Sequence, residues 1–569
     1  MERMRDGTAG TASATPGPRG ARLALALGLL YALLALAVYR PALGGAFISD
    51  DRMYLPENPW VQALTVENLQ VLLDPAGPPA RETQNWAPLH LLVHALEWRA
   101  FGPEVFGYHV VDVLLHAGVA ALLTLLLEGS GVPRLAALGG GLFFLLHPAN
   151  VEAVAWISQL KTTLAMLLCL AALLSCRRRP LLAGLLFAAA LLTKPTAAFA
   201  LPVAVLLCWT RAGGERASRR AWLGLAAWAV LLGVYTAIQL PLLAGNRFVV
   251  PPLHPEAAVR LRSLFAFWMR YLAMAATGYG VSAFQEPPPA LSPLDPWWLG
   301  GLGATLVLGT RTLQTAWARR PEAAWWIWAA AGFAPVSQLV PFLYPMADRY
   351  LYFILPGLVG GVLLWAGSLL HDLDGASRGS RRATLASRGL ALALLPLLVL
   401  FALRSHERAR LWRAPAWVKA DAAAHTPDGL VAHVLRAEAA GRRGDAPAAV
   451  RELRAAALRG FDRYDQLLAA PAYAPVRRDP EFQAVVRELA RRWAEQEPHL
   501  VHPTQRELRG LAQAHLVLGE YEDAERLLQR ALEAGGPESA AVRGELAVTR
   551  AARERAAGDA GGGATGVTP

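Results

Sequence analysis

Roughly the first 400 residues of the chain alternate between long apolar segments and short polar ones. Several apolar segments reach the length of about 20 residues that a helix needs to cross a bilayer. They lie at 21–39, 109–128, 135–147, 160–175, 181–193, 197–209, 221–243, 297–316, 323–343, 350–370 and 387–403. The pattern predicts a transmembrane helical domain over residues 21–404 with about 11 spans. The first run is expected to be a span rather than a cleaved signal peptide, because it is long and many more follow.

Arginines give these spans a direction, because Lys and Arg collect in the cytoplasmic loops of membrane proteins. Arginine clusters stand before residue 21, at 177–179, within 211–220, at 319–320 and within 378–382. With the N-terminus inside, alternation places a first external loop at 41–108 and the chain after 404 outside. A further span at 263–282 would put the last two clusters outside, so we expect that segment to be interfacial or re-entrant.

The composition agrees with a membrane protein, since 54% of the 569 residues are hydrophobic and only 17% are charged. Soluble proteins carry roughly 25% charged residues, so a soluble single-domain enzyme and a largely disordered chain are excluded. The net charge of +11 comes almost wholly from arginine, and no nucleic-acid-binding module accompanies it. No nucleic acid partner is therefore expected. The three cysteines lie in or beside apolar segments and fit packing positions rather than disulfides or a zinc site.

After residue 404 the chain becomes rich in Ala, Arg, Glu and Leu with helical periodicity. Two stretches share a glycine followed five residues later by an alanine, Gly519 with Ala524 and Gly444 with Ala449. Small residues at these offsets let paired helices pack closely, as in tetratricopeptide repeats. We predict a repeat-like α-solenoid over 405–557, with an unrelated helical bundle as the alternative. Two ends flank the domains, a disordered cytoplasmic N-terminus at 1–20 and a flexible tail at 558–569.

The first external loop is too long to be a mere connector. It opens with Asp50 and Asp51, and adjacent carboxylates above a bilayer can act as a general base or bind a cation. A helix cap or solvated loop acids are the alternative. The same loop contains NWAPLHLLVHALEWRAFG, an interfacial amphipathic helix with Trp86 and His90 near its start. The histidines of this region occur at scattered depths, and we predict no metal site from them.

The second external loop reads HPANVEAVAWISQLK and brings together His147, Glu152 and Lys161. A lysine is a flexible point charge suited to a phosphate. Glu152 can equally be a structural partner of Lys161. This loop therefore offers a second acid and a first cation to the external face.

Two further cations are predicted to reach the same face. Lys194 lies between two short apolar runs, where a charge is expensive and indicates a functional site unless it snorkels to the interface. Arg349, followed by Tyr350, stands at the external start of a span and offers a bidentate fork for phosphate. Its alternative role is a structural cap with Asp348. Acids and cations at one membrane surface suit a reaction between an anionic lipid donor and an external nucleophile.

Six ordered motifs carry a family resemblance: FISDDRMYLPENPWV, NWAPLHLLVHAL, GYHVVDVLLH, HPANVEAVAWISQLKTTLA, LLTKPTAAFALP and MADRYLYFILPG. Over about residues 22–404 the chain resembles the bacterial relatives of the transmembrane-and-tetratricopeptide-repeat O-mannosyltransferases, in the GT-C superfamily of membrane glycosyltransferases. The repeat-bearing tail agrees with this resemblance. The implied fold class is all-α, a GT-C-like transmembrane helical domain followed by the repeat-like solenoid.

The resemblance implies a polyprenyl-phosphate-linked sugar as donor, drawn from the membrane lipid, and an acceptor protein recognised by the repeats. It implies that Asp50, Asp51 and Glu152 are catalytic and that Lys161, Lys194 and Arg349 bind the donor phosphate. Trp86, His90, His147 and Tyr350 lie in or beside the same motifs and are expected to line the substrate pocket. No cofactor or metal ligand is implied, and participation of a divalent cation is left open.

Two positions depart from the family pattern. Leu160 stands where many relatives have a basic residue, and Asp112 stands where they commonly carry Asn. Both departures bear on donor affinity and sugar identity.

The resulting hypothesis is an inverting glycosyltransferase of the bacterial inner membrane with its C-terminal domain in the periplasm. It would move mannose or another hexose from the lipid donor to hydroxyls of a protein. Two alternatives stay open: a non-catalytic membrane scaffold that uses its repeats for assembly, and a ligase or flippase for lipid-linked saccharides.

Overall fold

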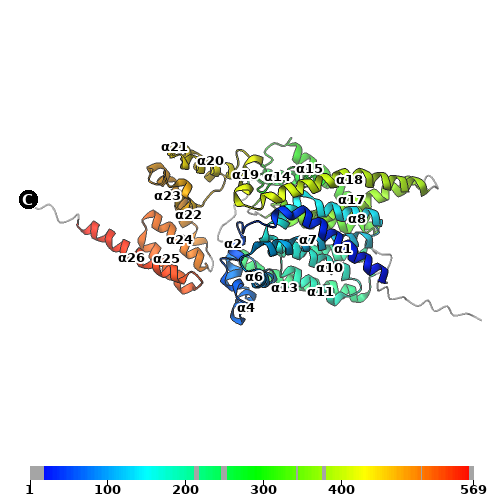
Figure 1. The fold of residues 1–569 in the computed structure, drawn as a ribbon, viewed down its shortest axis with the longest axis horizontal. Helices are drawn as coiled ribbons and strands as arrows, with labels where there is room; N and C mark the ends of the chain where they lie inside the picture. Colours follow the sequence, from blue (N-terminus) through cyan, green and yellow to red (C-terminus); the bar gives the residue numbers. More distant parts are fainter. Residues whose placement is uncertain are drawn as a thin grey trace, which may run out of the picture.

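The computed structural model describes residues 18–210, 217–244, 253–340, 344–374, 380–500 and 503–562. Within these ranges all of the secondary-structure elements are helices. One isolated β-bridge joins Gln285 to Met346. The predicted all-α fold class is confirmed. Figure 1 shows a large helical body and a smaller C-terminal helical domain beside one end of it.

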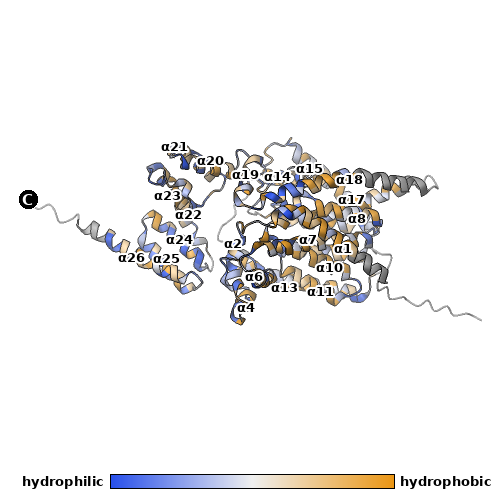
Figure 2. Cartoon of the chain, viewed as in Figure 1, coloured by the Kyte–Doolittle hydropathy of each residue, from blue (hydrophilic) through white to orange (hydrophobic). Residues whose placement is uncertain are grey.

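The body is built from helices that coincide with the apolar segments of the sequence. Each of the eleven predicted segments overlaps one of these helices. They are α1 (Pro18–Tyr39), α7 (Val105–Gly129), α8 (Arg134–Leu146), α10 (Leu160–Ser175), α11 (Pro180–Leu191), α12 (Ala200–Trp209), α13 (Arg219–Ala244), α15 (Pro296–Trp317), α16 (Glu322–Phe333), α17 (Asp348–Asp374) and α18 (Ser380–Leu411). Hydrophobic residues dominate them in Figure 2, whereas the C-terminal domain is largely hydrophilic.

Not all of these helices are long enough to cross a bilayer alone. Among the described residues four are long and apolar enough, namely Val105–Gly129, Ile157–Ser175, Arg219–Leu242 and Asp348–Leu370. A fifth is possible if Arg134–Leu146 and Pro148–Ala155, bent by 49°, form one span. Shorter apolar helices lie at Ala26–Ala42, Pro180–Leu191 and Pro195–Trp209. The chain is therefore a multi-pass membrane protein by its helices, and the number of spans stays a prediction.

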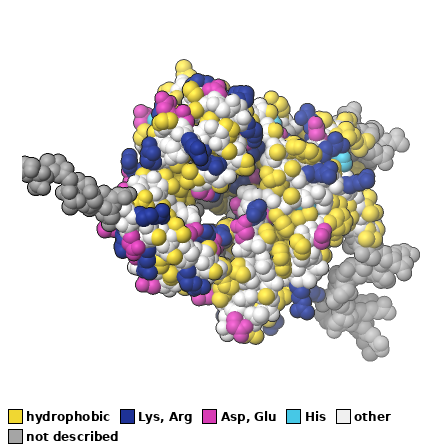
Figure 3. Space-filling model, turned by 60° about the vertical axis from the view of Figure 1, so that its left-hand side comes forward, with side chains coloured by type: hydrophobic (Ala, Val, Ile, Leu, Met, Phe, Trp, Pro, Cys, Tyr) yellow, Lys and Arg dark blue, Asp and Glu magenta, His cyan; other side chains and the backbone are white. Residues whose placement is uncertain are grey.

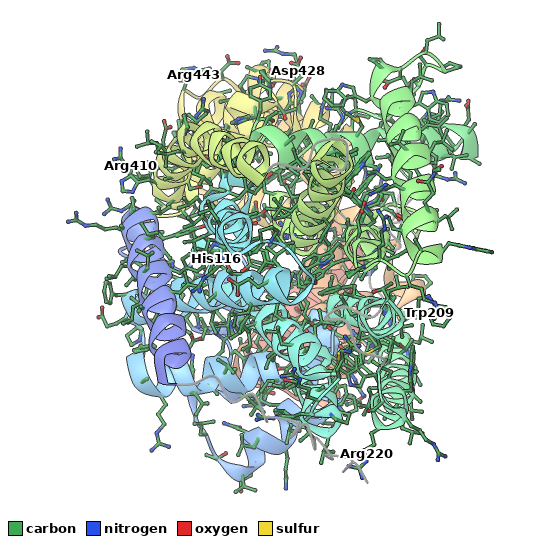
Figure 4. The ribbon with its side chains drawn as sticks, turned by 90° about the vertical axis from the view of Figure 1, so that its right-hand side faces the viewer. His116, Trp209, Arg220, Arg410, Asp428 and Arg443 are labelled. Atoms are coloured by element: carbon green, nitrogen blue, oxygen red, sulfur yellow. The ribbon has the colours of Figure 1, made fainter. Side chains whose placement is uncertain are left out.

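Polar side chains inside the body are bonded between helices. His116 of α7 lies in the interior (Figure 4), where one ring nitrogen contacts the Tyr352 hydroxyl at 2.9 Å and the other contacts the Leu145 carbonyl at 3.0 Å. Both ring nitrogens are thus used to join α7 to α17 and α8, which gives this histidine a structural role.

Helix α14 (Ala257–Thr277) covers most of the segment predicted to be interfacial or re-entrant. Near its middle, Phe265 packs against Gly301, where the helices approach so closely that no larger side chain fits at the glycine. Trp268 packs on Phe333 at the end of α16. These contacts hold α14 at the end of the body where α15 begins and α16 ends.

Residues 41–104 form a small helical cap on this same end of the body. The cap contains α2 (Asp51–Tyr54), α3 (Pro59–Gln62), α4 (Val66–Leu73), α5 (Pro78–Thr83) and α6 (Pro88–Phe101). It has its own apolar cluster, in which Tyr54, Leu55, Val61 and Leu91 are buried. The predicted amphipathic helix is α6, which turns His90, Leu91 and His94 into this cluster.

The C-terminal domain begins without a break in the chain's helical path. Helix α18 runs through the predicted boundary at 404/405 and ends at Leu411. The helices that follow are α19 (Pro415–His425), α20 (Leu430–Arg442), α21 (Ala446–Leu458), α22 (Tyr464–Ala469), α23 (Pro480–Ala494), α24 (Gln505–Leu518), α25 (Tyr521–Ala534) and α26 (Ser539–Gly562). Helix α26 therefore includes residues 558–562 of the predicted flexible tail.

The two repeat-like stretches fall on antiparallel helix pairs, α20 with α21 and α24 with α25. Gly519 ends α24 with φ +82, a conformation that glycine adopts without strain. Ala524 is fully buried one turn later, so α25 can pack closely on α24. The small residues thus serve the packing role that their spacing indicated.

The cap and the C-terminal domain face each other at one end of the body. Pro78 and Arg81 of α5 lie across a cavity of about 70 Å³ from residues 503–506 and 534–538 of the C-terminal domain. Figure 3 shows charged side chains gathered on that domain and hydrophobic ones over the body. At the opposite end, Arg319 lies over the Trp209 ring at 4.6 Å. The arginine pattern predicted the first loop and the tail to share a side, and the fold puts them at the same end.

We predict that this shared end is extracytoplasmic. Asp428 and Arg220 are both exposed and labelled in Figure 4, and the native cysteines are buried, so a cysteine-free background is available by Cys→Ala substitution. In spheroplasts, Asp428→Cys should react with a membrane-impermeant maleimide. Arg220→Cys should react only after permeabilisation. The reverse labelling pattern would overturn the topology.

Candidate active site

Asp51 is buried at the start of α2 and is held by backbone amides. Its Oδ2 accepts a hydrogen bond from the Ile48 N–H at 2.8 Å, and its Oδ1 accepts one from the Ser158 N–H at 2.7 Å. Burial raises the pKa of Asp51 to about 7, and these hydrogen bonds oppose the shift. Asp51 therefore closes the turn of the first loop through Oδ2 and joins that loop to the second loop through Oδ1.

Asp50 differs from its neighbour because the chain turns sharply just before it. Ser49 has φ +52, which is unusual and strained for a residue other than glycine. Asp50 is half-buried, and its carboxylate accepts a hydrogen bond from the Ser49 hydroxyl at 3.3 Å. Burial raises the pKa of Tyr344, and the Asp50 carboxylate adds to that rise, so Asp50 lies within electrostatic reach of residue 344.

Glu152 and Arg349 form a buried ion pair between the second loop and the start of α17. The Arg349 guanidinium donates to Glu152 Oε1, and the Arg349 backbone N–H donates to Oε2 at 2.7 Å. The glutamate side chain is 3% exposed and the arginine side chain is 15% exposed. The rings of Trp156, Tyr344 and Tyr350 lie 5.0–5.4 Å from the guanidinium. Aromatic faces and a carboxylate thus fix the orientation of this cation.

The two lysines lie next to one another in space. Lys161 Nζ donates to the Tyr54 hydroxyl at 3.1 Å and stands 4.7 Å from the centre of that ring. Lys194 Nζ donates to the Thr162 hydroxyl at 2.6 Å, beside Lys161 in the chain. Both side chains are half-buried. Lys194 is also within electrostatic reach of Arg349 and Glu152.

Five separate segments therefore meet at one end of the body. They supply Asp50 and Asp51 from the start of α2, Glu152 from the second loop, Lys161 from α10, Lys194 from the turn after α11, and Arg349 from α17. The start of α6 is tied to the same place, because the Leu89 N–H donates to the Leu192 carbonyl at 3.0 Å. The structure brings together all six residues predicted to be catalytic or phosphate-binding, and their chemical roles stay proposals.

The four predicted pocket residues fall into two groups. His90 and Tyr350 lie beside the cations: the His90 ring packs edge-on to Tyr54, and Tyr350 lies under Arg349. Burial lowers the pKa of His90 well below its usual value, with further lowering from His94, Lys161 and Lys194. His90 therefore lies in the same surroundings as the two lysines and packs between Tyr54 and His94.

The other two have contacts that support the surrounding loops. Trp86 stacks on Tyr235, and its indole N–H donates to the Leu73 carbonyl at 3.0 Å. His147 is buried, with Nδ1 accepting from the Ala149 N–H and Nε2 contacting the Ala275 carbonyl, both at 3.2 Å. Both residues hold neighbouring segments together.

Both structural alternatives for the charged residues turn out wrong in their choice of partner. Glu152 pairs with Arg349 rather than Lys161, because the second loop turns Glu152 toward α17 while Lys161 faces the cap. Asp348 does not cap Arg349; its carboxylate accepts from the Gln285 side chain at 2.8 Å and lies 3.9 Å from Arg408.

Sequence reasoning missed Tyr54 and the role of Trp156. Tyr54 follows Asp50 by four positions on a one-turn helix, so it shares the face that carries the acid. Trp156 donates its indole N–H to the Ile48 carbonyl at 3.1 Å while its ring lies over Arg349. The helical offset could have indicated Tyr54, whereas nothing near Trp156 in the sequence indicates Ile48.

Metal-compatible spacing of three ligands occurs, among the described residues, in the C-terminal domain at His515, Glu520 and Asp523. There His515 contacts Glu520 at 2.6 Å and Asp523 pairs with Arg526 at 3.0 Å. His515 Nδ1, Glu520 and Asp523 are thus each engaged by a neighbouring side chain, and His515 Nε2 lies 3.7 Å from Glu497. In the cap, His94 contacts Glu97 at 2.7 Å, and both are buried.

Known proteins resemble parts of this chain. A family model described as tetratricopeptide repeat matches residues 506–549. Protein O-mannosyl-transferase Tmtc1 of Drosophila melanogaster is 37% identical over 189 residues, covering 31% of this chain and 21% of that protein. Protein O-mannosyl-transferase tmtc2 of Xenopus laevis is 35% identical over 139 residues, covering 23% and 16%. The chain thus spans about a fifth of the length of these relatives.

Among solved structures, ArnT from Cupriavidus metallidurans bound to undecaprenyl phosphate superposes with a TM-score of 0.30. That match has 16% sequence identity and covers 74% of this chain and 80% of ArnT. The motifs, the aligned relatives and the repeat agree with one another. Over part of its length the chain is thus similar to protein O-mannosyl-transferases, and its C-terminal domain is similar to tetratricopeptide repeats.

Proposed function

We propose that this protein is a membrane glycosyltransferase that moves a sugar from a polyprenyl-phosphate donor to an acceptor hydroxyl on the external face. The observation that carries the proposal is that the segment carrying Asp50 contacts the surroundings of the cations. Lys161 donates to Tyr54 of α2, and Trp156, whose ring faces Arg349, donates to the Ile48 carbonyl. Lys194 is bonded to Thr162, next to Lys161. A carboxylate base beside three cations suits an acceptor hydroxyl and an anionic leaving group. The aligned O-mannosyl-transferases support mannose or a related hexose as the sugar.

In the proposed reaction the acceptor oxygen forms a bond to the anomeric carbon of the sugar. The bond from that carbon to the phosphate oxygen breaks, and its electron pair leaves with the lipid phosphate. Asp50 takes the hydroxyl proton as general base. Asp50 suits this role better than Asp51, because both oxygens of Asp51 already accept backbone hydrogen bonds.

The three cations would act on the leaving group. Negative charge grows on the phosphate as the sugar leaves, and fixed cations stabilise that charge without reorganising during the reaction. Glu152 holds Arg349 in place for this task through two contacts, one to its side chain and one to its backbone. We assign Glu152 to positioning rather than to proton transfer.

The C-terminal domain would select acceptor proteins, as paired-helix repeats commonly bind peptides on their surfaces. Its contact with the cap at Pro78 and Arg81 supports this role, because an acceptor bound there would lie on the same side of the body as Asp50. With this end external, the proposed location is the bacterial inner membrane with the C-terminal domain in the periplasm.

The lysines give a direct test of the phosphate assignment. Lys161→Met and Lys194→Met each keep the apolar stem and remove the charge. We expect each to lower kcat/KM for the lipid donor ~10-fold or more, because each removes an interaction that strengthens in the transition state. Donor titrations with membranes containing each variant measure the effect. Lys419→Met, a partly exposed lysine of the C-terminal domain, is the matched control and should leave donor use unchanged.

The function itself is tested with radiolabelled polyprenyl-phosphate mannose and membranes containing the wild-type protein. Label appearing in protein supports the proposal. Label appearing in a larger lipid-linked glycan favours the ligase alternative, and label that only changes membrane face favours the flippase. Absence of transfer, together with partner proteins captured through the repeats, favours the scaffold.

A further inference from the structure

A charged chain of contacts joins the C-terminal domain to the start of α17. Arg408, near the end of α18, donates through both terminal nitrogens to the two carboxylate oxygens of Asp421, each at 3.3 Å. The same guanidinium lies 3.9 Å from Asp348. All three side chains are nearly buried, with exposures of 11%, 10% and 3%. Asp421 belongs to α19 and Asp348 begins α17, so Arg408 stands between the two domains.

A short segment after α14 doubles this connection. We call residues 280–286 the clasp. The Ala283 N–H donates to Asp421 at 2.9 Å, and the Gln285 side chain donates to Asp348 at 2.8 Å. At its end, Glu286 accepts a hydrogen bond from the Leu430 N–H at the start of α20, also at 2.9 Å. The clasp therefore touches the C-terminal domain at two points and α17 at one.

This series of contacts ends beside Arg349, the cation proposed to bind the donor phosphate. Asp348 directly precedes Arg349, whose backbone N–H is bonded to Glu152. The clasp also contacts the segment just before Asp348, because Gln285 forms an isolated β-bridge with Met346. A shift of α19 would thus displace Asp348 through its contacts with Arg408 and Gln285. It would also displace Arg349, which is the next residue in the sequence.

We propose that Arg408 is a positioning residue that makes the setting of Arg349 depend on the docking of the C-terminal domain. The position of the domain that would bind the acceptor is then coupled to the position of the cation that would bind the donor. Removing Arg408 would also leave Asp348 and Asp421 buried beside each other without their shared cation, which is costly for carboxylates. The consequence for sugar transfer rests on the function proposed above, whereas the structural coupling does not.

The coupling is measured by hydrogen exchange on the full-length protein in nanodiscs. Peptides covering 280–286 report on the clasp, and peptides covering 346–350 report on the Arg349 amide. Arg408→Met should make both regions exchange about tenfold faster, since each relies on charge-assisted hydrogen bonds. Asp421→Asn, which acts from the C-terminal domain, should produce the same pair of changes. Arg410→Met is the matched control, because Arg410 is exposed on the same helix, as Figure 4 shows.

Faster exchange in 280–286 alone, or in neither region, overturns the proposal, because Arg408 would then only hold the domains together or do nothing. If Arg408→Met does not fold, Arg408→Lys keeps the charge but loses the two-pronged contact with Asp421, and the same two regions decide.

Sugar transfer supplies a second readout. Arg408→Met should raise the donor KM of the folded enzyme by about 2- to 30-fold, the range seen for residues that couple sites. Combined with Arg349→Lys its effect should be less than additive, because both act through one cation. Additive effects contradict the coupling. A wild-type enzyme without transfer contradicts the proposed function but leaves the exchange result standing.

Discussion

Replacing Asp50 with Asn is expected to lower the kcat for sugar transfer ~10²–10⁴-fold, the contribution typical of a general base. The variant should insert and fold normally, because the Asp50 side chain is half-buried and accepts a hydrogen bond from the neighbouring Ser49 hydroxyl. The amide keeps the size of the side chain and loses its ability to accept a proton. Initial rates at saturating donor and acceptor, corrected for the amount of folded protein, measure the loss.

Two neighbours in the first loop serve as controls. Glu57→Gln breaks an exposed ion pair with Arg52 and should change neither rate nor stability by much. Asp51→Asn presents an amide N–H to one of two backbone donors, so it should destabilise the junction with Ser158. If Asp50→Asn kept near-wild-type transfer while Asp51→Asn abolished it in folded protein, the base would be Asp51. Retention by both variants would refute base catalysis by this pair.

Replacing Arg349 with Met is expected to cost about 3–5 kcal/mol of unfolding free energy, because it leaves the Glu152 carboxylate buried without its partner. It should also abolish use of the lipid donor. The double variant Arg349→Met with Glu152→Gln removes the uncompensated charge, so it should recover most of the stability and none of the transfer. Denaturation in detergent and donor-dependent transfer are measured on the same preparations.

A closely matched ion pair, suitable as a control, lies at the opposite end of the helical body. Arg311 and Glu322 contact one another at 2.7 Å with exposures of 18% and 3%, and Arg311 also faces a tryptophan ring, at 5.5 Å. Arg311→Met should destabilise the protein to a similar degree, yet its folded fraction should keep normal donor use. Recovery of transfer in the Arg349 and Glu152 double variant would remove Arg349 from the donor site.

Much of the architecture could be predicted from the sequence because it depends on local patterns. Apolar length predicted the helices of the body, arginine placement predicted that 41–108 and the tail share an end, and glycine–alanine spacing predicted the paired helices. Each of these signals lies within a few turns of chain. The acids of the first loop could likewise be identified from a short local motif.

The choice of partners could not be predicted, because it depends on contacts between distant segments. From sequence, Glu152 had a plausible partner nine positions away in Lys161, yet it pairs with Arg349, 197 positions away. Asp348 similarly turns from its neighbour to Arg408. The different surroundings of Asp50 and Asp51 arise from a single residue, since the left-handed turn at Ser49 directs one carboxylate inward and leaves the other near the surface.

Helix α18 has a consequence for the acceptors that this protein would select. Its apolar part lies within the body, where it packs on α1 and α8, and the helix continues without a break past residue 404 to Leu411. A flexible linker would let a tethered substrate sample many distances and give it an averaged effective concentration. A helical rod instead fixes the reach between the docking surface and Asp50. The hydroxyls that receive sugar should therefore lie a nearly constant number of residues from the segment that the repeats bind.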